Sequence, residues 1–282
     1  LESMEFTRDA TFVALGGGIV GDVGGFVAAT FLRGMNLIHI PTTITGQVDS
    51  AIGGKVAVNH NDTINAIGTY YHPRAIFIDT DFIAALPERE FRSGMGEVVK
   101  SAIIKDADFC RFLLNHSKEI TDRVPEVLVD MVQRTIRIKL AHVESDVREK
   151  GIRLYLNYGH TIGQAIEIAT DLEHEIYRHG EAVGLGMMAA ARLADLYYND
   201  GADRVASHRQ LLEAFHLPLS IDMRLVAGDP SSLQRSIYAN LFKDKKRISA
   251  GLRFVLIPKI GSAETVVNVS EPDIRTAIES LF

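Results

Sequence analysis

Cysteine is nearly absent from this chain of 282 residues. The single Cys110 excludes an internal disulfide framework and is typical of a protein kept in a reducing compartment. No uninterrupted apolar run is long enough to cross a bilayer. The first five residues show neither the basic nor the apolar region of a signal peptide. We therefore expect a soluble, cytoplasmic protein.

The chain also lacks any block of charges of one sign. Its 30 basic and 36 acidic residues are interleaved, and the formal net charge is −6. The absence of a segment rich in lysine and arginine excludes nucleic acid as an expected partner. A small anionic substrate remains compatible with the composition, because a local basic pocket can form in an acidic protein.

What is present is a hydrophobic content of 46%, enough for one or two domains. Short apolar runs over 11–15, 37–40 and 75–78 predict strands, and 22–33 predicts a helix. This alternation is typical of an α/β layer with a buried parallel sheet. Three strands are fewer than the roughly six of a dinucleotide-binding sheet, so this part is expected to be N-terminally incomplete.

After Pro87 the spacing of apolar residues becomes helical. The predicted helices cover 88–107, 123–148, 160–170, 180–197, 203–215 and 230–242. A strand pair over 252–257 and 265–269 should follow. A last helix should begin at Ser270 as N-cap, with Pro272 in its first position.

These patterns predict an α/β part over 1–90 and a mainly α-helical part over 91–282. The chain shows no internal repeats and no low-complexity linker between them. We therefore expect the two parts to pack closely around a shared cleft.

Residues 16–22, Gly-Gly-Gly-Ile-Val-Gly-Asp, match G-x-G-x-x-G between a predicted strand and a predicted helix. Glycines in that place let the backbone approach a pyrophosphate, which the helix N-terminus then binds through free N–H groups. The acidic residue that usually follows about 20 residues later to hold a ribose is not evident. A plain glycine-rich turn is the alternative.

Polar residues follow the next strand as well. Thr42 and Thr43 stand where ligands often bind, at the carboxyl end of a sheet. Asp49 precedes a paired-glycine turn that ends in Lys55. Such a lysine can bind a phosphate, although a solvated side chain on an exposed turn is an equal alternative.

Three polar residues on separate helices form a candidate metal site. One carboxylate, Glu97, and two imidazoles, His160 and His179, make a standard catalytic ligand set that favours zinc. Because the chain has ten histidines, three unrelated polar residues are the alternative. Each of the three has a glycine as neighbour, which would let the helices approach closely enough to share an ion.

The residues around His160 extend this site. Asn157 precedes the glycine that marks the helix start, and Gln164 lies four residues after His160, on the same face of the helix. Basic residues elsewhere could line a pocket for a phosphorylated, carboxylated substrate: Lys100, Lys139, Arg153 and the cluster at 244–247. Each of them alone is more often a solvated charge.

The order of these segments resembles that of 3-dehydroquinate synthase and the related sugar-phosphate cyclases. The similarity runs nearly end to end, and a series of motifs is far more specific than any one of them. The motifs are GGGIVGDVGGF, FLRG, PTTITGQVDSAIGGKVAVNH, LPEREFRSGMGEVVK, LNYGHTIGQAIE, HGEAVGLGMMAAARLA and DKK.

The resemblance implies a homodimeric enzyme that uses NAD and a divalent metal ion, zinc or cobalt. In the family's main reaction, 3-deoxy-arabino-heptulosonate 7-phosphate becomes 3-dehydroquinate and phosphate. A hydroxyl is transiently oxidised by NAD, phosphate is eliminated, the ketone is reduced again, and an intramolecular aldol reaction closes the ring. The 1–90 part would then be a partial Rossmann-like NAD-binding domain, and the 91–282 part would bind metal and substrate.

The resemblance also implies roles for single residues. Glu97, His160 and His179 would hold the metal. The nucleotide would be held by Gly18, Ile19, Val20, Gly21, Asp22, Thr42, Thr43, Lys55 and Asn65. The substrate and the reaction would involve Asp49, Lys100, Lys139, Arg153, Asn157, Gln164 and Lys246, with Arg33 reaching the phosphate bound by a neighbouring subunit.

Two positions depart from the family pattern. Gln164 stands where relatives usually have a histidine, and Ile64 stands where they have a lysine before Asn65. Glutamine can donate a hydrogen bond but cannot shuttle a proton near neutral pH. The departures keep open a paralogous cyclase that uses glucose 6-phosphate or a heptulose phosphate, although Asn157 argues against the inosose-forming branch.

Two further alternatives remain. The family carries an α/β stretch before the part that this chain matches, including a ribose-binding segment. A truncated homologue that serves as a binding or assembly module is therefore one alternative. A metal-dependent polyol dehydrogenase, which would release reduced NAD stoichiometrically, is the other.

Overall fold

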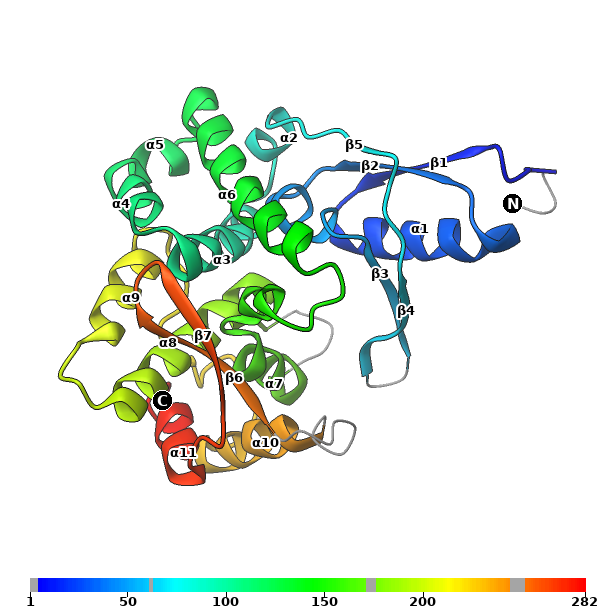
Figure 1. Ribbon diagram of the computed structural model, residues 1–282. Helices are drawn as coiled ribbons and strands as arrows, with labels where there is room; N and C mark the ends of the chain where they lie inside the picture. Colours follow the sequence, from blue (N-terminus) through cyan, green and yellow to red (C-terminus); the bar gives the residue numbers. More distant parts are fainter. Residues whose placement is uncertain (1–4, 61–62, 171–175, 244–251) are drawn as a thin grey trace.

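A computed structural model describes residues 5–60, 63–170, 176–243 and 252–282 of the chain. The chain forms a small α/β part that contains the N-terminus and a larger helical part that contains the C-terminus (Figure 1). Among the described residues, no helix combines the length and the apolar character needed to cross a membrane.

The α/β part contains the predicted parallel sheet. Its strands β1 (Thr11–Gly16), β2 (Asn36–Pro41) and β5 (Ala75–Ile76) lie in the order β1-β2-β5, and both pairings are parallel. Helix α1 (Gly18–Thr30) connects β1 to β2. The prediction of an α/β layer with a parallel sheet is confirmed.

Strand β1 is buried on one side rather than on both, so the prediction of a fully buried strand was wrong. Ala14 is 3% exposed and packs with Ala28 of α1, whereas Val13 and Leu15 are 50% and 57% exposed. Side chains alternate along a strand, and within the described residues α1 covers only the Ala14 side. The other face of β1 carries apolar side chains that no described segment covers.

Helix α1 begins at Gly18 and ends at Thr30, not at the predicted residues 22 and 33. Gly16 ends β1 and Gly17 is the N-cap, whereas Gly18 and Gly21 lie in the first turn of the helix. The chain leaves the helix through the short turn η2 (Phe31–Arg33), in which Leu32 has a φ of 47°. A left-handed residue cannot continue an α-helix.

A β-hairpin that the sequence analysis did not predict follows β2. The turn η3 (Gly46–Ser50) leads to strands β3 (Lys55–His60) and β4 (Thr63–Tyr70), which pair antiparallel and pack beside α1. The paired-glycine turn before Lys55 is confirmed, because Gly53 and Gly54 have φ values of +103° and +71°. That backbone conformation favours glycine.

The helical part contains all the helices that the apolar spacing predicts, with ends shifted by a few residues. The structure adds short helices between the first two of them. The elements are α2 (Asp81–Ala84), α3 (Glu88–Lys105), α4 (Ala107–Asn115), α5 (Ser117–Thr121), α6 (Pro125–Ser145), η4 (Ile152–Asn157), α7 (His160–Thr170), α8 (His179–Tyr198), α9 (Arg204–Glu213) and α10 (Pro230–Lys243).

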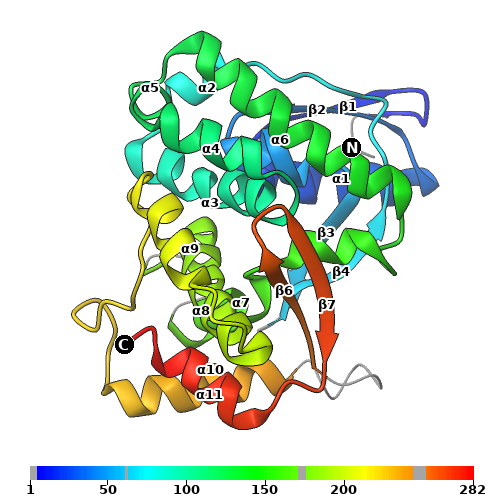
Figure 2. The same cartoon turned by 60° about the vertical axis from the view of Figure 1, so that its left-hand side comes forward.

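The predicted strand pair near the C-terminus is confirmed as β6 (Arg253–Lys259) and β7 (Ser262–Val267), a hairpin that packs on α8 and α3 (Figure 2). Helix α11 (Glu271–Glu279) ends the chain. The Ser270 hydroxyl caps it by accepting a hydrogen bond from the Asp273 N–H at 3.2 Å. Because the helix begins at Glu271, Pro272 is its second residue and not its first.

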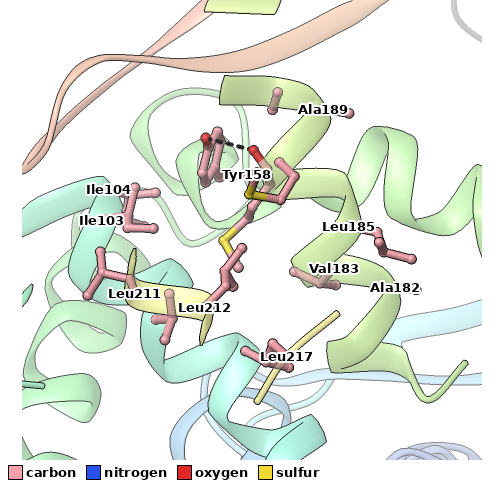
Figure 3. Close-up of a cluster of buried hydrophobic side chains, with 14 of the residues drawn as sticks. Ile103, Ile104, Tyr158, Ala182, Val183, Leu185, Ala189, Leu211, Leu212 and Leu217 are labelled. Atoms are coloured by element: carbon pink, nitrogen blue, oxygen red, sulfur yellow. Dashed lines mark hydrogen bonds between the residues drawn. The ribbon is translucent and has the colours of Figure 1, made fainter. Parts of the chain in front are cut away.

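Helix α8 forms the centre of the core. Its side chains pack with the fully buried Tyr158 and with α9 and the segment after it (Figure 3). The residues labelled there are Ile103, Ile104, Tyr158, Ala182, Val183, Leu185, Ala189, Leu211, Leu212 and Leu217. A helix buried on all sides provides a fixed platform for residues at its first turn.

Glycines bring α8 into backbone contact with its neighbours. A methyl group at Gly180 would lie 1.7 Å from the carbonyl oxygen of Ser93 on α3. A methyl group at Gly186 would lie 1.9 Å from the carbonyl oxygen of Gly159, just before α7. The predicted close approach of these helices is therefore confirmed, and it places the starts of α7 and α8 against the middle of α3.

Candidate active site

The three predicted metal ligands meet at the contact of α3, α7 and α8. Glu97 lies in the middle of α3, and His160 and His179 are the first residues of α7 and α8. Glu97 Oε1 lies 3.5 Å from His160 Nε2 and 3.4 Å from His179 Nε2. One ligand atom from each residue lies within 4.8 Å of the other two.

The chemistry of these side chains fits a divalent metal ion. Glu97 is 1% exposed, and its Oε1 accepts no hydrogen bond of normal geometry from the described residues. A buried carboxylate oxygen without a donor is costly unless a cation compensates it. One oxygen and two imidazole nitrogens that face each other form a zinc-type ligand set.

Each imidazole is oriented by a contact of its other nitrogen. Nδ1 of His160 lies 3.1 Å from the carbonyl oxygen of Tyr158, and Nδ1 of His179 lies 3.1 Å from Oε1 of Glu167. Both rings therefore present Nε2 to Glu97. The sequence analysis missed Glu167, although an acidic residue seven positions after His160 lies on the same face of the helix.

The charges of the site favour opposite states for the two histidines. Burial and then the nearby Lys100 lower the pKa of His160 to about 4. Burial also disfavours the His179 cation, but the carboxylates of Glu167 and Glu97 outweigh it and raise the pKa of His179 to about 10. Although burial opposes it, Lys100 followed by the two histidines holds the pKa of Glu97 well below its usual range.

Two buried lysines extend the site towards the α/β part. Lys100 pairs with Glu97 and lies 3.7 Å from Asp49, and Lys139 of α6 lies 2.6 Å from the same Asp49 oxygen. Burial, followed by the charge of Lys100, lowers the pKa of Lys139 despite the opposing effect of Asp49. Burial also disfavours the charged form of Lys100, but the carboxylates of Glu97 and Asp49 outweigh this effect and raise the pKa of Lys100. The structure thus brings Asp49, Lys100 and Lys139 together with the three metal-ligand candidates.

Arg153 and Asn157 lie on η4, which packs against α6 and α3. Arg153 is 1% exposed, and its guanidinium donates to the carbonyl oxygens of Val147 at 2.6 Å and Gly53 at 2.9 Å. These bonds tie the start of the hairpin to the helical part.

Asn157 and Lys55 share a partner that the sequence analysis missed. The carboxylate of Glu149 accepts a hydrogen bond from Asn157 at 3.0 Å and forms an ion pair with Lys55. Glu149 lies in a loop of alternating charges, where no spacing distinguishes it from solvated residues. Its contacts join a residue predicted for the nucleotide to one predicted for the substrate.

The predicted nucleotide residues gather at the carboxyl ends of β1 and β2. The Thr42 N–H donates to the Gly16 carbonyl oxygen at 2.9 Å, and a methyl group at Gly17 would lie 3.1 Å from Thr43. Asp22 lies on the first turns of α1, where burial and then the charge of Asp49 raise its pKa to about 6. Gly18 and Gly21 are part-buried in this turn, whereas Ile19 and Val20 are 77% and 43% exposed.

Asn65 and Arg33 lie outside the cluster of predicted nucleotide residues. Asn65 is near the tip of the β3–β4 hairpin, where its N–H donates to Asn59 at 2.9 Å. Arg33 is exposed beyond the C-terminal end of α1, and a helix of 13 residues puts it about 20 Å from the glycine turn. Gln164 is half-buried on α7. Lys246 lies outside the described residues.

Two family models match the chain, "3-dehydroquinate synthase N-terminal" over residues 1–93 and "3-dehydroquinate synthase C-terminal" over residues 94–247. A 3-dehydroquinate synthase of Idiomarina loihiensis is 41% identical over 273 residues, which are 97% of this chain and 74% of that protein.

Two solved structures are similar over the whole chain. A 2-epi-5-epi-valiolone synthase from Streptomyces hygroscopicus, with NAD+ and Zn2+ bound, has a TM-score of 0.88 at 26% identity, covering 99% of this chain and 76% of that one. A 2-deoxy-scyllo-inosose synthase complexed with carbaglucose-6-phosphate, NAD+ and Co2+ has a TM-score of 0.84 at 31% identity, covering 100% and 76%.

Proposed function

The chain belongs to the 3-dehydroquinate synthase family, and on that premise we propose that it is an NAD- and metal-dependent cyclase. Its proposed substrate is 3-deoxy-arabino-heptulosonate 7-phosphate, and its products are 3-dehydroquinate and phosphate. The observation that carries the proposal is the junction of Glu97, His160 and His179 with the part-buried ion pair of Asp49 and Lys139.

In this proposal Glu97, His160 and His179 hold the metal ion, and the glycine turn before α1 holds the NAD pyrophosphate. A bound NAD would accept and return a hydride, and a bound zinc or cobalt ion would polarise the hydroxyl that loses it. The division into a nucleotide part, 1–90, and a metal and substrate part, 91–282, is part of the same proposal.

The basic residues would bind the anionic groups of the substrate. Lys100 and Lys139 are both less than 10% exposed, so a carboxylate or phosphate that reaches them exchanges water for fixed cations. Asp49 holds Lys139 in place, and Asn157 would hydrogen-bond a substrate oxygen. Gln164 is proposed to act at the phosphate end of the substrate, Lys246 to contact the substrate, and Arg33 to reach the phosphate bound by a neighbouring subunit.

A related cyclase of secondary metabolism is the second candidate. Gln164 stands where the family pattern has a histidine and Ile64 where it has a lysine, and both changes lie among residues proposed for ligand binding. One similar structure, the 2-deoxy-scyllo-inosose synthase, is complexed with an analogue of glucose 6-phosphate. A site whose phosphate-binding residues differ from the family pattern would suit a different sugar phosphate.

A substrate panel separates the two candidates. The chain is loaded with zinc or cobalt, mixed with NAD, and given the heptulosonate phosphate, glucose 6-phosphate or a heptulose phosphate, and phosphate release is followed. We expect turnover of the heptulosonate phosphate; turnover of another sugar phosphate alone would favour the second candidate. His160→Ala should abolish release, and His116→Ala, at a part-buried residue between α4 and α5, should leave it unchanged.

A further inference from the structure

Glu167 is a buried carboxylate within an otherwise apolar stretch of α7. It is 1% exposed and follows the fully buried Ile166. A carboxylate removed from water costs several kcal/mol unless a charged or hydrogen-bonding partner compensates it. A buried acid at this position therefore needs a specific partner.

One such partner is His179, the first residue of α8. Glu167 Oε1 lies 3.1 Å from His179 Nδ1, and Nε2 of the same ring lies 3.4 Å from Glu97 Oε1. The imidazole is thus held between a carboxylate of α7 and a carboxylate of α3. With Nδ1 donating to Glu167, the ring nitrogen left for an ion is Nε2, which faces Glu97.

The two histidines of the site are held by different acceptors. His160 donates from Nδ1 to the Tyr158 carbonyl oxygen, a neutral acceptor, whereas His179 donates to a charged one. A hydrogen bond to a carboxylate is stronger than one to a neutral oxygen, and it makes the opposite ring nitrogen a better electron donor. His179 should therefore be the more firmly oriented of the two ligands.

We propose that Glu167 is a positioning residue of the metal centre. Its carboxylate fixes the orientation and the tautomer of His179, and it thereby raises the affinity of the chain for a divalent ion. The inference rests on the proposed metal site of Glu97, His160 and His179. It concerns the side chain that supports a ligand, not a further ligand.

The test measures metal affinity and not turnover. Metal-free parent, Glu167→Gln and Glu167→Ala are titrated with Co2+ and Zn2+ against a chelator of known affinity, and the visible spectrum of bound Co2+ is recorded. Glu167→Ala should bind about 10- to 100-fold more weakly. Glu167→Gln should fall between it and the parent, because an amide oxygen still accepts the Nδ1 proton but carries no charge.

A matched control separates positioning from stability. Asp195 is another part-buried carboxylate, and it pairs with Arg204 on α9, away from the metal ligands. Asp195→Asn should lower the thermal stability of the metal-free chain and leave its metal affinity within about twofold of the parent. The Glu167 variants should show a loss of metal affinity that their thermal stability does not explain.

The proposal is overturned if both Glu167 variants bind Co2+ and Zn2+ within twofold of the parent, or if Asp195→Asn weakens binding as much as they do. If Glu167→Ala does not fold, Glu167→Gln decides alone, and a loss of less than about threefold overturns the proposal. A parent chain that binds neither ion contradicts the proposed function itself, which is a distinct result.

Discussion

The Glu149 carboxylate accepts a hydrogen bond from the Asn157 amide, with 3.0 Å between the two atoms. Its second oxygen pairs with Lys55 at the start of β3. Glu149 thus binds both Lys55 and Asn157, the cation and the hydrogen-bond donor that we propose for ligand binding. It also connects the α/β part to the helical part.

This arrangement predicts that Glu149→Gln strengthens the binding of an anionic ligand. The carboxylate competes with the ligand for Lys55 and Asn157 and also repels it. Removing the charge removes the repulsion and weakens the competition, because an amide oxygen is a weaker partner for the Lys55 cation. Lys55 is half exposed, so the gain should be about 1 kcal/mol or less, which is up to about fivefold in the NAD dissociation constant. Calorimetric titration with NAD measures it.

The gain should shrink at high salt, because an exposed charge is screened. Glu144→Gln, at an exposed position on α6, is the control and should bind NAD as the parent does. Weaker binding by Glu149→Gln would show that the carboxylate orders the site for its ligand instead of competing with it.

The backbone contact between α8 and the segment before α7 predicts that Gly186→Ala is severely destabilising. Its methyl group would lie 1.9 Å from the Gly159 carbonyl oxygen, so the helix must move. The free energy of unfolding should fall by about 3 kcal/mol or more, as measured in urea.

Gly184→Ala on the same helix is the matched control. Its methyl group would meet Leu212 and Leu217 at 3.7 Å, an ordinary contact. Because alanine favours a helix over glycine, this variant should be as stable as the parent or up to about 1 kcal/mol more stable. Equal effects of the two substitutions would contradict the close packing.

The buried ion pair of Glu97 and Lys100 predicts coupling between the two residues. Both are 1% exposed, so Glu97→Gln leaves a buried ammonium whose nearest remaining carboxylate among the described residues is the more distant Asp49. We expect a loss of about 3–5 kcal/mol in the unfolding free energy of the metal-free chain. The double variant Glu97→Gln with Lys100→Met should recover part of that loss. If the changes in unfolding free energy from the two single substitutions, measured in denaturant titrations, simply add up in the double variant, Glu97 and Lys100 are not coupled.

The raised pKa of Asp22 predicts a dependence of stability on pH. Burial and the charge of Asp49 raise that pKa from 3.8 to about 6, so between these values the folded chain holds a proton that the unfolded chain has lost. Stability should therefore fall as the pH rises from about 4 to about 6, by about 2 kcal/mol for a side chain that water partly reaches.

Asp22→Asn removes this titration. The variant should match the parent near pH 3.5 and exceed its unfolding free energy at pH 8, while the exposed Asp9→Asn should follow the parent throughout. If the unfolding free energy of the parent changes between pH 4 and pH 6 in the same way as that of Asp22→Asn, the raised pKa of Asp22 is contradicted.

Features with a local sequence pattern could be predicted, and features that depend on contacts between distant residues could not. The helices α3 and α6 to α10 were predictable because apolar residues recur along them at helical spacing, and the metal candidates stood out because glycines accompany them. The β3–β4 hairpin was not predictable, because its exposed residues show little alternation of polar and apolar side chains. Glu149 acts through residues far away in the sequence, and only the fold shows that it meets Lys55 and Asn157.

The one measurement that tests the central proposal most directly is the stoichiometry of phosphate and NADH. The metal-loaded chain is mixed with a limiting amount of NAD and an excess of 3-deoxy-arabino-heptulosonate 7-phosphate. Phosphate is quantified while absorbance at the NADH band is followed. Our account predicts many phosphates released per NAD with no net NADH. Absence of phosphate release, or one NADH formed for each substrate consumed, would contradict it.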